Sequence, residues 1–172
     1  MEWPFKHVLE ATTIVLNGEQ FKVSRWRQDA DRSKAFSEAP EFLLATDQEV
    51  IFASLAGLFC GPYPRATVAL CSNFAQVVSL VEGLRVPLLI VSPQNLLLYD
   101  GGESLITLML RVPQLRVKVY TGAQGVIEML AGTSVSDRID VLYLPVQPRE
   151  FHGAIAQRFG FDLPEWFVKA VP

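Results

Sequence analysis

The sequence has 172 residues, of which half are hydrophobic and 19% are charged, and its formal net charge is −3. This length corresponds to one domain, or to one domain with a modest extension, and the low charge content excludes intrinsic disorder for most of the chain. The negative charge argues against a nucleic-acid binder that works by bulk charge, and no apolar run approaches the roughly 20 residues that cross a bilayer.

The first 40 residues have a pattern of their own. Two short strand-like runs, TTIVL and EQFKVSRW, flank Asn17-Gly18, a pair that readily adopts the positive φ angles of a tight hairpin turn. We interpret the polar segment after Trp26 as a linker or an exposed short helix that ends at Pro40. The N-terminus shows no basic segment followed by an apolar one, so we expect no signal peptide and a cytoplasmic protein.

From Glu41 onward, short apolar runs alternate with helix-like segments. Five runs have the composition of buried strands: FLLAT (42–46), ATVALCS (66–72), VPLLIVS (86–92), RVKVYTG (116–122) and DVLYLPV (140–146). The helical segments that follow them lie at 47–59, 74–84, 103 to about 112, 123–132 and 148–159. Asp47 and Asn73 are the expected N-caps of the first two helices.

Five strands that alternate with five helices predict parallel strands joined by right-handed crossovers. The strand-like runs lack a clean polar–apolar alternation, as expected for strands covered on both faces. We therefore predict an α/β fold of the flavodoxin-like, doubly wound kind, with a five-stranded parallel sheet in the order 2-1-3-4-5 and an N-terminal β-hairpin extension. The expected sections are residues 1–40, 41–160 and 161–172, the last being a short tail.

The closing segment VLYLPVQPREFHGAIAQRF resembles the end of a response-regulator receiver domain. In that family a strand, a Lys-Pro pair and a short polar loop precede a helix that starts near a Pro-acidic pair; here the proline is Pro145 and the helix opens at Pro148 to Glu150. The fourth predicted strand ends in Tyr120 to Gly122, similar to the family's strand that ends in Thr or Ser and a small residue. The resemblance spans residues 41–160 and implies a CheY-like fold and a role in two-component signal transduction.

Receiver domains accept a phosphoryl group on an aspartate at the end of the third strand. An acidic pair holds Mg²⁺, and a hydroxyl and a lysine neutralise the phosphoryl oxygens. The resemblance places the acidic pair on Thr46 and Asp47, the phosphoacceptor on Ser92 and the hydroxyl on Thr121. It places the lysine on Leu144 and the proline that follows the lysine on Pro145. The nucleophile, one acid and the cation are missing from these positions, so the resemblance implies a degenerate pseudo-receiver with no cofactor, no metal and no aspartyl phosphorylation.

The face made by the fourth helix, fifth strand and fifth helix of receiver domains commonly mediates dimer and partner contacts. The resemblance implies a similar interaction face here, with the candidate residues Ile127, Glu128, Leu130, Tyr143, Arg149, Phe151, His152 and Arg158. Tyr143 matches the aromatic that couples this face to the phosphorylation pocket in the family. We expect His152 to be at the surface or half-buried.

Several hydrophobic features lie beyond what one sheet-facing side requires. Two helical segments, 50–59 and 105–112, carry apolar side chains around a wide arc, which the hairpin, a second copy of the chain or another protein would cover. The tryptophans Trp3, Trp26 and Trp166 lie outside the receiver-like section and either anchor the two end segments or mark a binding surface.

The two cysteines, Cys60 and Cys71, lie in apolar surroundings, and we predict that both are buried free thiols.

These observations favour a non-enzymatic, non-phosphorylatable signalling protein that acts through protein–protein contact. We expect a homo-oligomer with an unidentified protein partner, and no binding of nucleic acid or membrane. The alternative is a small-molecule-binding protein or enzyme whose site lies at the C-terminal strand ends, around Thr46-Asp47, Ser92 to Asn95, Thr121-Gly122 and Pro145 to Gln147. These loops offer one carboxylate and neither histidine nor lysine, a poor catalytic set.

Overall fold

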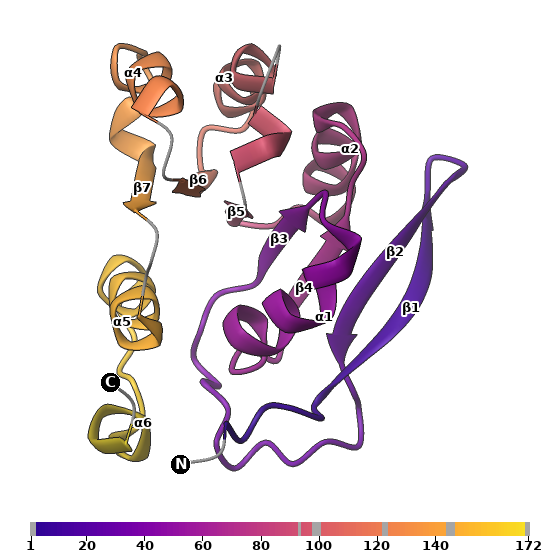
Figure 1. The fold of residues 1–172 in the computed structure, drawn as a ribbon, viewed down its shortest axis with the longest axis vertical. Coiled ribbons are helices and arrows are strands. Elements are labelled where there is room, and N and C mark those ends of the chain that lie inside the picture. The colour runs from indigo at the N-terminus through magenta and orange to yellow at the C-terminus, as the bar shows by residue number, and fades with distance from the viewer. Residues whose placement is uncertain (1–2, 93, 98–100, 122–123, 144–146, 171–172) are drawn as a thin grey trace.

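The computed structural model describes residues 3–92, 94–97, 101–121, 124–143 and 147–170. One sheet runs through the molecule and is covered by helices on both faces (Figure 1). Its strands are β1 (Leu9–Leu16), β2 (Glu19–Trp26), β3 (Phe42–Thr46), β4 (Ala66–Leu70), β5 (Leu88–Val91), β6 (Arg116–Thr121) and β7 (Ile139–Tyr143). The helices are α1 (Phe52–Leu55), α2 (Phe74–Leu84), α3 (Gly101–Arg111), α4 (Gln124–Ala131), α5 (Pro148–Phe159) and α6 (Glu165–Ala170), with short turns η1 (Glu49–Ile51), η2 (Ala56–Cys60), η3 (Gln94–Leu97) and η4 (Ser136–Arg138).

The sheet has seven strands in the order β1-β2-β4-β3-β5-β6-β7. The prediction of five strands in the order 2-1-3-4-5 is therefore wrong for the sheet as a whole. The hairpin β1–β2 does not stand apart as an extension, because β2 pairs antiparallel with β4, with Ser24 opposite Val68. The remaining part, β4-β3-β5-β6-β7, is parallel throughout and is the doubly wound portion of the fold.

The parallel strands send alternate side chains into two separate hydrophobic clusters. Leu43 and Leu89 belong to the cluster covered by α2, α3 and α4, whereas Phe42 and Leu88 belong to the cluster covered by α1, η2 and α5. Figure 1 shows α2, α3 and α4 in a row on one side of the strands and α1 and α5 on the other. All four strand side chains are fully buried, which explains the unbroken apolar runs in the sequence.

The hairpin turn has the predicted geometry. Asn17 and Gly18 have φ angles of 53° and 77°, and the flanking strands pair over their whole length, from Leu9 opposite Trp26 to Leu16 opposite Glu19. The side chain of Leu16 lies directly on α2, since a β carbon added to Gly83 would lie 2.9 Å from a Leu16 methyl group. Glycine in this helix therefore lets the hairpin approach closely.

The segment after β3 differs from the predicted helix 47–59. It consists of a 3₁₀ turn (η1), a short α-helix (α1) and a π-helical turn (η2). Asp47 is not the N-cap, because Gln48 occupies that position and the hydroxyl of Thr46 accepts the Gln48 amide hydrogen at 3.2 Å. Asn73 caps α2 as predicted, with its side-chain oxygen accepting from the Gln76 amide at 3.0 Å.

Tryptophan side chains satisfy carbonyl groups at the π-helical turn. A π turn disrupts the usual i→i−4 ladder and leaves carbonyls in need of donors. The indole Nε1 of Trp3 donates to the Gly57 carbonyl at 2.8 Å, and that of Trp26 donates to the Gly61 carbonyl. These contacts support the interpretation of the tryptophans as anchors of the N-terminal section.

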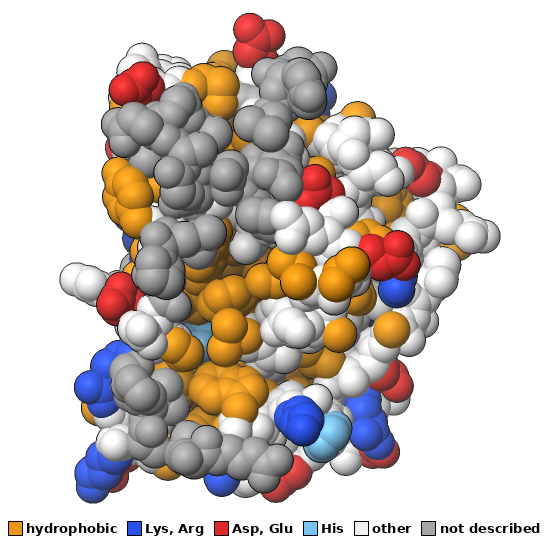
Figure 2. All heavy atoms as spheres, in the orientation of Figure 1, with side chains coloured by type: hydrophobic (Ala, Val, Ile, Leu, Met, Phe, Trp, Pro, Cys, Tyr) orange, Lys and Arg blue, Asp and Glu red, His pale blue; other side chains and the backbone are white. Residues whose placement is uncertain are grey.

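The connecting segment and the tail are packed rather than exposed. Residues 27–40 form turns instead of a helix, and Phe36 and Ala39 are buried in the α1/α5 cluster. The tail contains α6, whose Phe167 is fully buried against the ring of Phe36. Figure 1 shows the first residues and α6 near each other, and Trp3 contacts Phe167 edge to face. The predicted linker and tail therefore complete the core. Figure 2 shows further hydrophobic side chains gathered on the surface in the region of α1.

Both cysteines are buried free thiols, as predicted. Burial raises the pKa of Cys71 to about 12 and that of Cys60 further, so both thiols stay protonated at neutral pH. Within the described ranges, none of the helices is both long and apolar enough to cross a bilayer.

Candidate functional site

The C-terminal ends of the parallel strands bring several predicted site residues to one edge of the sheet. Thr46 is the last residue of β3 and Ser92 follows β5, two strands that pair directly. Thr46 is fully buried and Ser92 is 4% exposed, and the Ser92 amide donates to the Ala45 carbonyl at 3.1 Å. Asp47, by contrast, is exposed. This edge therefore presents one solvated carboxylate beside two buried hydroxyl side chains.

Three predicted pocket residues are described in part or not at all. Leu144 and Pro145 lie outside the described residues, and Thr121 is described at the end of β6 by its backbone alone. Among the described residues, no group of three or more His, Cys, Asp or Glu side chains is placed to hold a metal ion.

The predicted interaction face is only partly exposed. Tyr143 is 58% exposed at the end of the edge strand β7, and Glu128, Arg149 and Arg158 are also exposed. Three other residues predicted for this face are buried: Leu130, Phe151 and His152. Their placement on the face is therefore wrong, and so is the expectation that His152 is at the surface or half-buried. Each lies on the inner side of its helix, in contact with the core. The side chain of Ile127 lies outside the described residues.

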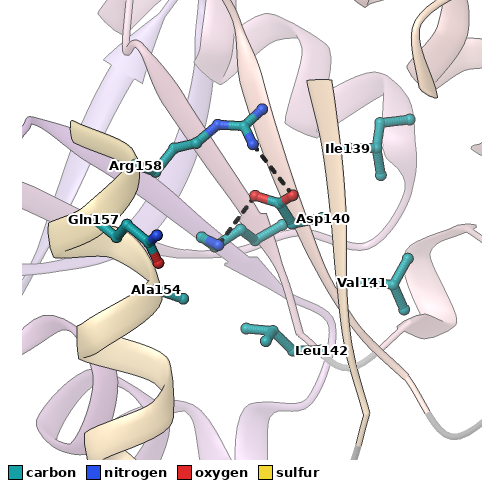
Figure 3. Close-up of a pocket in the computed structure, with 8 residues that line it drawn as sticks. Ile139, Asp140, Val141, Leu142, Ala154, Gln157 and Arg158 are labelled. Atoms are coloured by element: carbon teal, nitrogen blue, oxygen red, sulfur yellow. Dashed lines mark hydrogen bonds and ion pairs between the residues drawn. The ribbon is translucent and has the colours of Figure 1, made fainter. Parts of the chain in front are cut away.

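A surface groove runs between β7 and α5 on this side of the molecule. It has a volume of about 650 Å³ and is lined by Lys118, Ile139, Asp140, Val141, Leu142, Ala154, Gln157 and Arg158. Figure 3 shows Asp140 reaching from β7 toward α5, with Arg158 above it. The groove combines an apolar strand edge with a cluster of charges.

The charges in the groove do not cancel. The Lys118 side chain is 3% exposed, and its Nζ lies 3.2 Å from one carboxylate oxygen of Asp140. The other carboxylate oxygen lies 3.4 Å from the guanidinium of Arg158, which also donates to the Asp137 carbonyl. One carboxylate thus serves two cations, and the cluster keeps a net positive charge. Burial of an ammonium group is costly without such a partner.

Sequence reasoning missed two members of this cluster. It placed Arg158 on the face but assigned no role to Lys118 or Asp140. The signal was a lysine in the middle of the apolar run RVKVYT, which requires a carboxylate nearby if the strand is buried. The register supplies it, since Lys118 lies directly opposite Asp140 on the neighbouring strand.

A second polar pair is buried under α5. The Tyr63 hydroxyl lies 2.7 Å from Nδ1 of His152, and both residues are fully buried among aromatic rings. Burial lowers the pKa of His152 to about 3, with the Leu58 backbone carbonyl opposing the shift, so the imidazole is neutral at physiological pH. A neutral imidazole carries one N–H, so its tautomer sets the direction of the hydrogen bond with the Tyr63 hydroxyl. Trp3 stacks over the imidazole. This pair joins segments of the core and has no access to solvent.

No family model matches the chain, and no curated protein matches its sequence. Solved structures do match its fold. The signal receiver domain of an HD domain-containing protein from Pseudomonas fluorescens Pf-5 is 25% identical with a TM-score of 0.57, over 69% of this chain and 93% of that one. A CheY-like response regulator receiver domain protein from Methanospirillum hungatei JF-1 is 16% identical with a TM-score of 0.56, over 71% and 94%.

A third similar structure comes from a protein described as related to pilus assembly, from Burkholderia pseudomallei K96243. It is 21% identical with a TM-score of 0.57, over 72% of this chain and 92% of the other. At these identities the matches establish a fold, which is that of CheY-like receiver domains over about 70% of the chain.

Proposed function

We propose that this chain is a pseudo-receiver: a non-phosphorylatable regulatory protein of the cytoplasm that acts in signalling through protein–protein contact. One observation carries the proposal. The residue that follows β5, where receiver domains hold the phosphoacceptor aspartate, is Ser92, and its side chain is 4% exposed. A buried hydroxyl at this place offers neither a carboxylate nucleophile nor access for a phosphoryl donor.

The neighbouring positions support the same reading. The acidic pair that would hold Mg²⁺ is reduced to Asp47, because Thr46 occupies the other position and points its hydroxyl at the Gln48 amide. The lysine position holds Leu144 in the sequence, and an apolar side chain cannot neutralise phosphoryl oxygens. The solved structures with this fold are described as receiver domains, which are typically non-enzymatic signalling domains, so we propose a non-enzymatic role.

We propose that the edge formed by β7 binds a protein partner through the groove between β7 and α5 and through Tyr143, which is exposed at the end of the same strand. A partly apolar groove and an exposed aromatic residue are both typical of contact sites. The surplus positive charge of Lys118 and Arg158 over Asp140 favours a partner that presents an acidic side chain. Self-association of the chain is a further part of the proposal.

The phosphorylation claim is tested by incubating the protein with acetyl phosphate and Mg²⁺ and measuring its intact mass. We expect no adduct in the wild-type protein. The matched variant Ser92→Asp restores a carboxylate at the same place and shows whether the remaining pocket can use one. A wild-type adduct that is lost in Ser92→Ala would overturn the proposal.

The contact surface is tested by capture from native lysate with mild cross-linking and mass spectrometry. We expect Tyr143→Ala to reduce recovery of a specific partner. Leu110→Ala is the matched control, because Leu110 is 60% exposed but lies on α3, on the opposite side of the sheet. Equal losses in both variants, or none in either, would contradict the assignment of the surface.

A further inference from the structure

Strand β1 forms one edge of the seven-stranded sheet, and none of the other described segments pairs with its outer side. In Figure 1 the hairpin projects at the side of the molecule with β1 outermost. The strand is eight residues long and pairs with β2 without interruption. A long, regular edge of this kind presents a row of free backbone donors and acceptors to any strand that can approach.

The hairpin register determines which backbone groups face outward. In a two-residue hairpin the residues that flank the turn exchange hydrogen bonds, so Leu16 bonds to Glu19 and every second residue before it bonds to β2. The backbone amides and carbonyls of four residues therefore bond to β2: those of Leu16, Ile14, Thr12 and Glu10. The amides and carbonyls of Leu9, Ala11, Thr13 and Val15 point away from the sheet.

The edge lacks the devices that usually protect exposed strands. Its sequence LEATTIVL contains no proline, glycine or lysine, and Glu10 is its only charge. Val15 is 58% exposed, and Ala11, Thr12 and Thr13 are also exposed. The opposite edge, β7, is shorter and carries the ion-paired Asp140. Of the two edges, β1 is therefore the one suited to accept another strand.

We propose that β1 pairs antiparallel with β1 of a second copy of this chain, which joins two seven-stranded sheets across a two-fold axis. The outward groups permit this when Leu9 lies opposite Val15 and Ala11 lies opposite Thr13 of the other copy, with the axis near Thr12. Each strand then offers its free donors to the free acceptors of the other.

Charge placement favours a second copy as the occupant. In this register Glu10 lies opposite Ile14 of the other copy, so the only charge of each strand meets an uncharged side chain. No like charges therefore face each other along the pair.

The pairing deepens the self-association that belongs to the proposed function, and its test does not depend on the phosphorylation pocket or on Tyr143. Two eight-residue strands bury less surface than a standard interface, so the dimer is expected to be weak. Sedimentation velocity on the full chain from about 1 to 500 μM covers the dissociation constants of such interfaces.

The decisive variant is Thr13→Pro. Proline removes an outward-pointing amide hydrogen and leaves the β1–β2 hydrogen bonds in place. We expect it to raise the dissociation constant by about tenfold or more. Should the proline variant fail to fold, Val15→Lys adds a charge at an exposed position and serves the same purpose. Leu110→Ala, at an exposed position on α3, is the control and should leave the dimer intact, and Tyr143→Ala tests the rival interface at the opposite edge.

Hydrogen exchange identifies the paired edge directly. The amides of Ala11, Thr13 and Val15 should gain protection as protein concentration rises, whereas those of Thr12 and Ile14 should be protected at every concentration. A monomer throughout the range, a dimer that neither β1 variant weakens, or a dimer that Tyr143→Ala alone disrupts would each overturn the proposal. The last result would instead assign self-association to the groove between β7 and α5.

Discussion

Acidification should lower the free energy of unfolding of this protein through one buried histidine, His152. Burial lowers the pKa of His152 from 6.5 to about 3 in the folded chain, whereas the unfolded chain keeps the ordinary value. Below pH 6.5 the unfolded chain takes up a proton that the folded chain refuses until about pH 3, so stability falls as the pH falls between these values. The loss is about 1.4 kcal/mol per pH unit, or about 2 kcal/mol between pH 7.5 and pH 5.0.

The assay is urea unfolding of the wild-type protein at pH 7.5 and pH 5.0, followed by tryptophan fluorescence. In thermal unfolding the same change corresponds to about 4–8 °C for a chain of this size. His152→Gln removes the titrating group, and we expect it to lower stability at pH 7.5 and to lose most of the difference between the two pH values. His7→Gln is the matched control, because His7 is exposed.

Equal pH dependence in wild type and His152→Gln would refute the reasoning. It would mean that the imidazole takes up a proton in the folded chain as readily as in the unfolded chain. The carboxylates are the same in all three proteins, so their contribution cancels when the variants are compared.

Two further substitutions test packing and charge in the same part of the molecule. Gly61→Ala should destabilise the fold by about 1–3 kcal/mol in urea unfolding, because its new β carbon would lie 2.5 Å from that of Phe5. Gly57→Ala, four residues earlier, has open space and should be neutral or slightly stabilising; equal effects would contradict the packing. Asp140→Asn leaves the buried ammonium of Lys118 with a neutral partner and should cost about 2 kcal/mol at neutral pH; an unchanged unfolding midpoint would show that this ammonium does not depend on the carboxylate.

The doubly wound core could be predicted because each strand is a continuous apolar run between recognisable helix boundaries. Asn73 and the Asn17-Gly18 turn behave as their local chemistry predicts. The helix after β3 could not be predicted in detail. Its π-helical turn depends on donors from Trp3 and Trp26, which lie far away in sequence, so no local pattern reveals it.

The candidate site shows the same division. The sequence shows that position 92 carries no carboxylate, but the burial of the Ser92 side chain depends on tertiary packing. The local sequence does not show that Phe151 and His152 are buried. They are buried because the N-terminal segment and α6 cover that side of α5. Local sequence patterns give no signal for such long-range cover.

The contact between Trp3 and Phe167 has a consequence for the order of events during synthesis. A receiver-like unit that ended with α5 would leave the rings of Trp3, Phe5 and Phe36 without α6 as a partner. While the ribosome is still making the last segment, these early side chains have no complete binding site and remain available to chaperones. Folding therefore reaches completion only after residue 167 has left the exit tunnel.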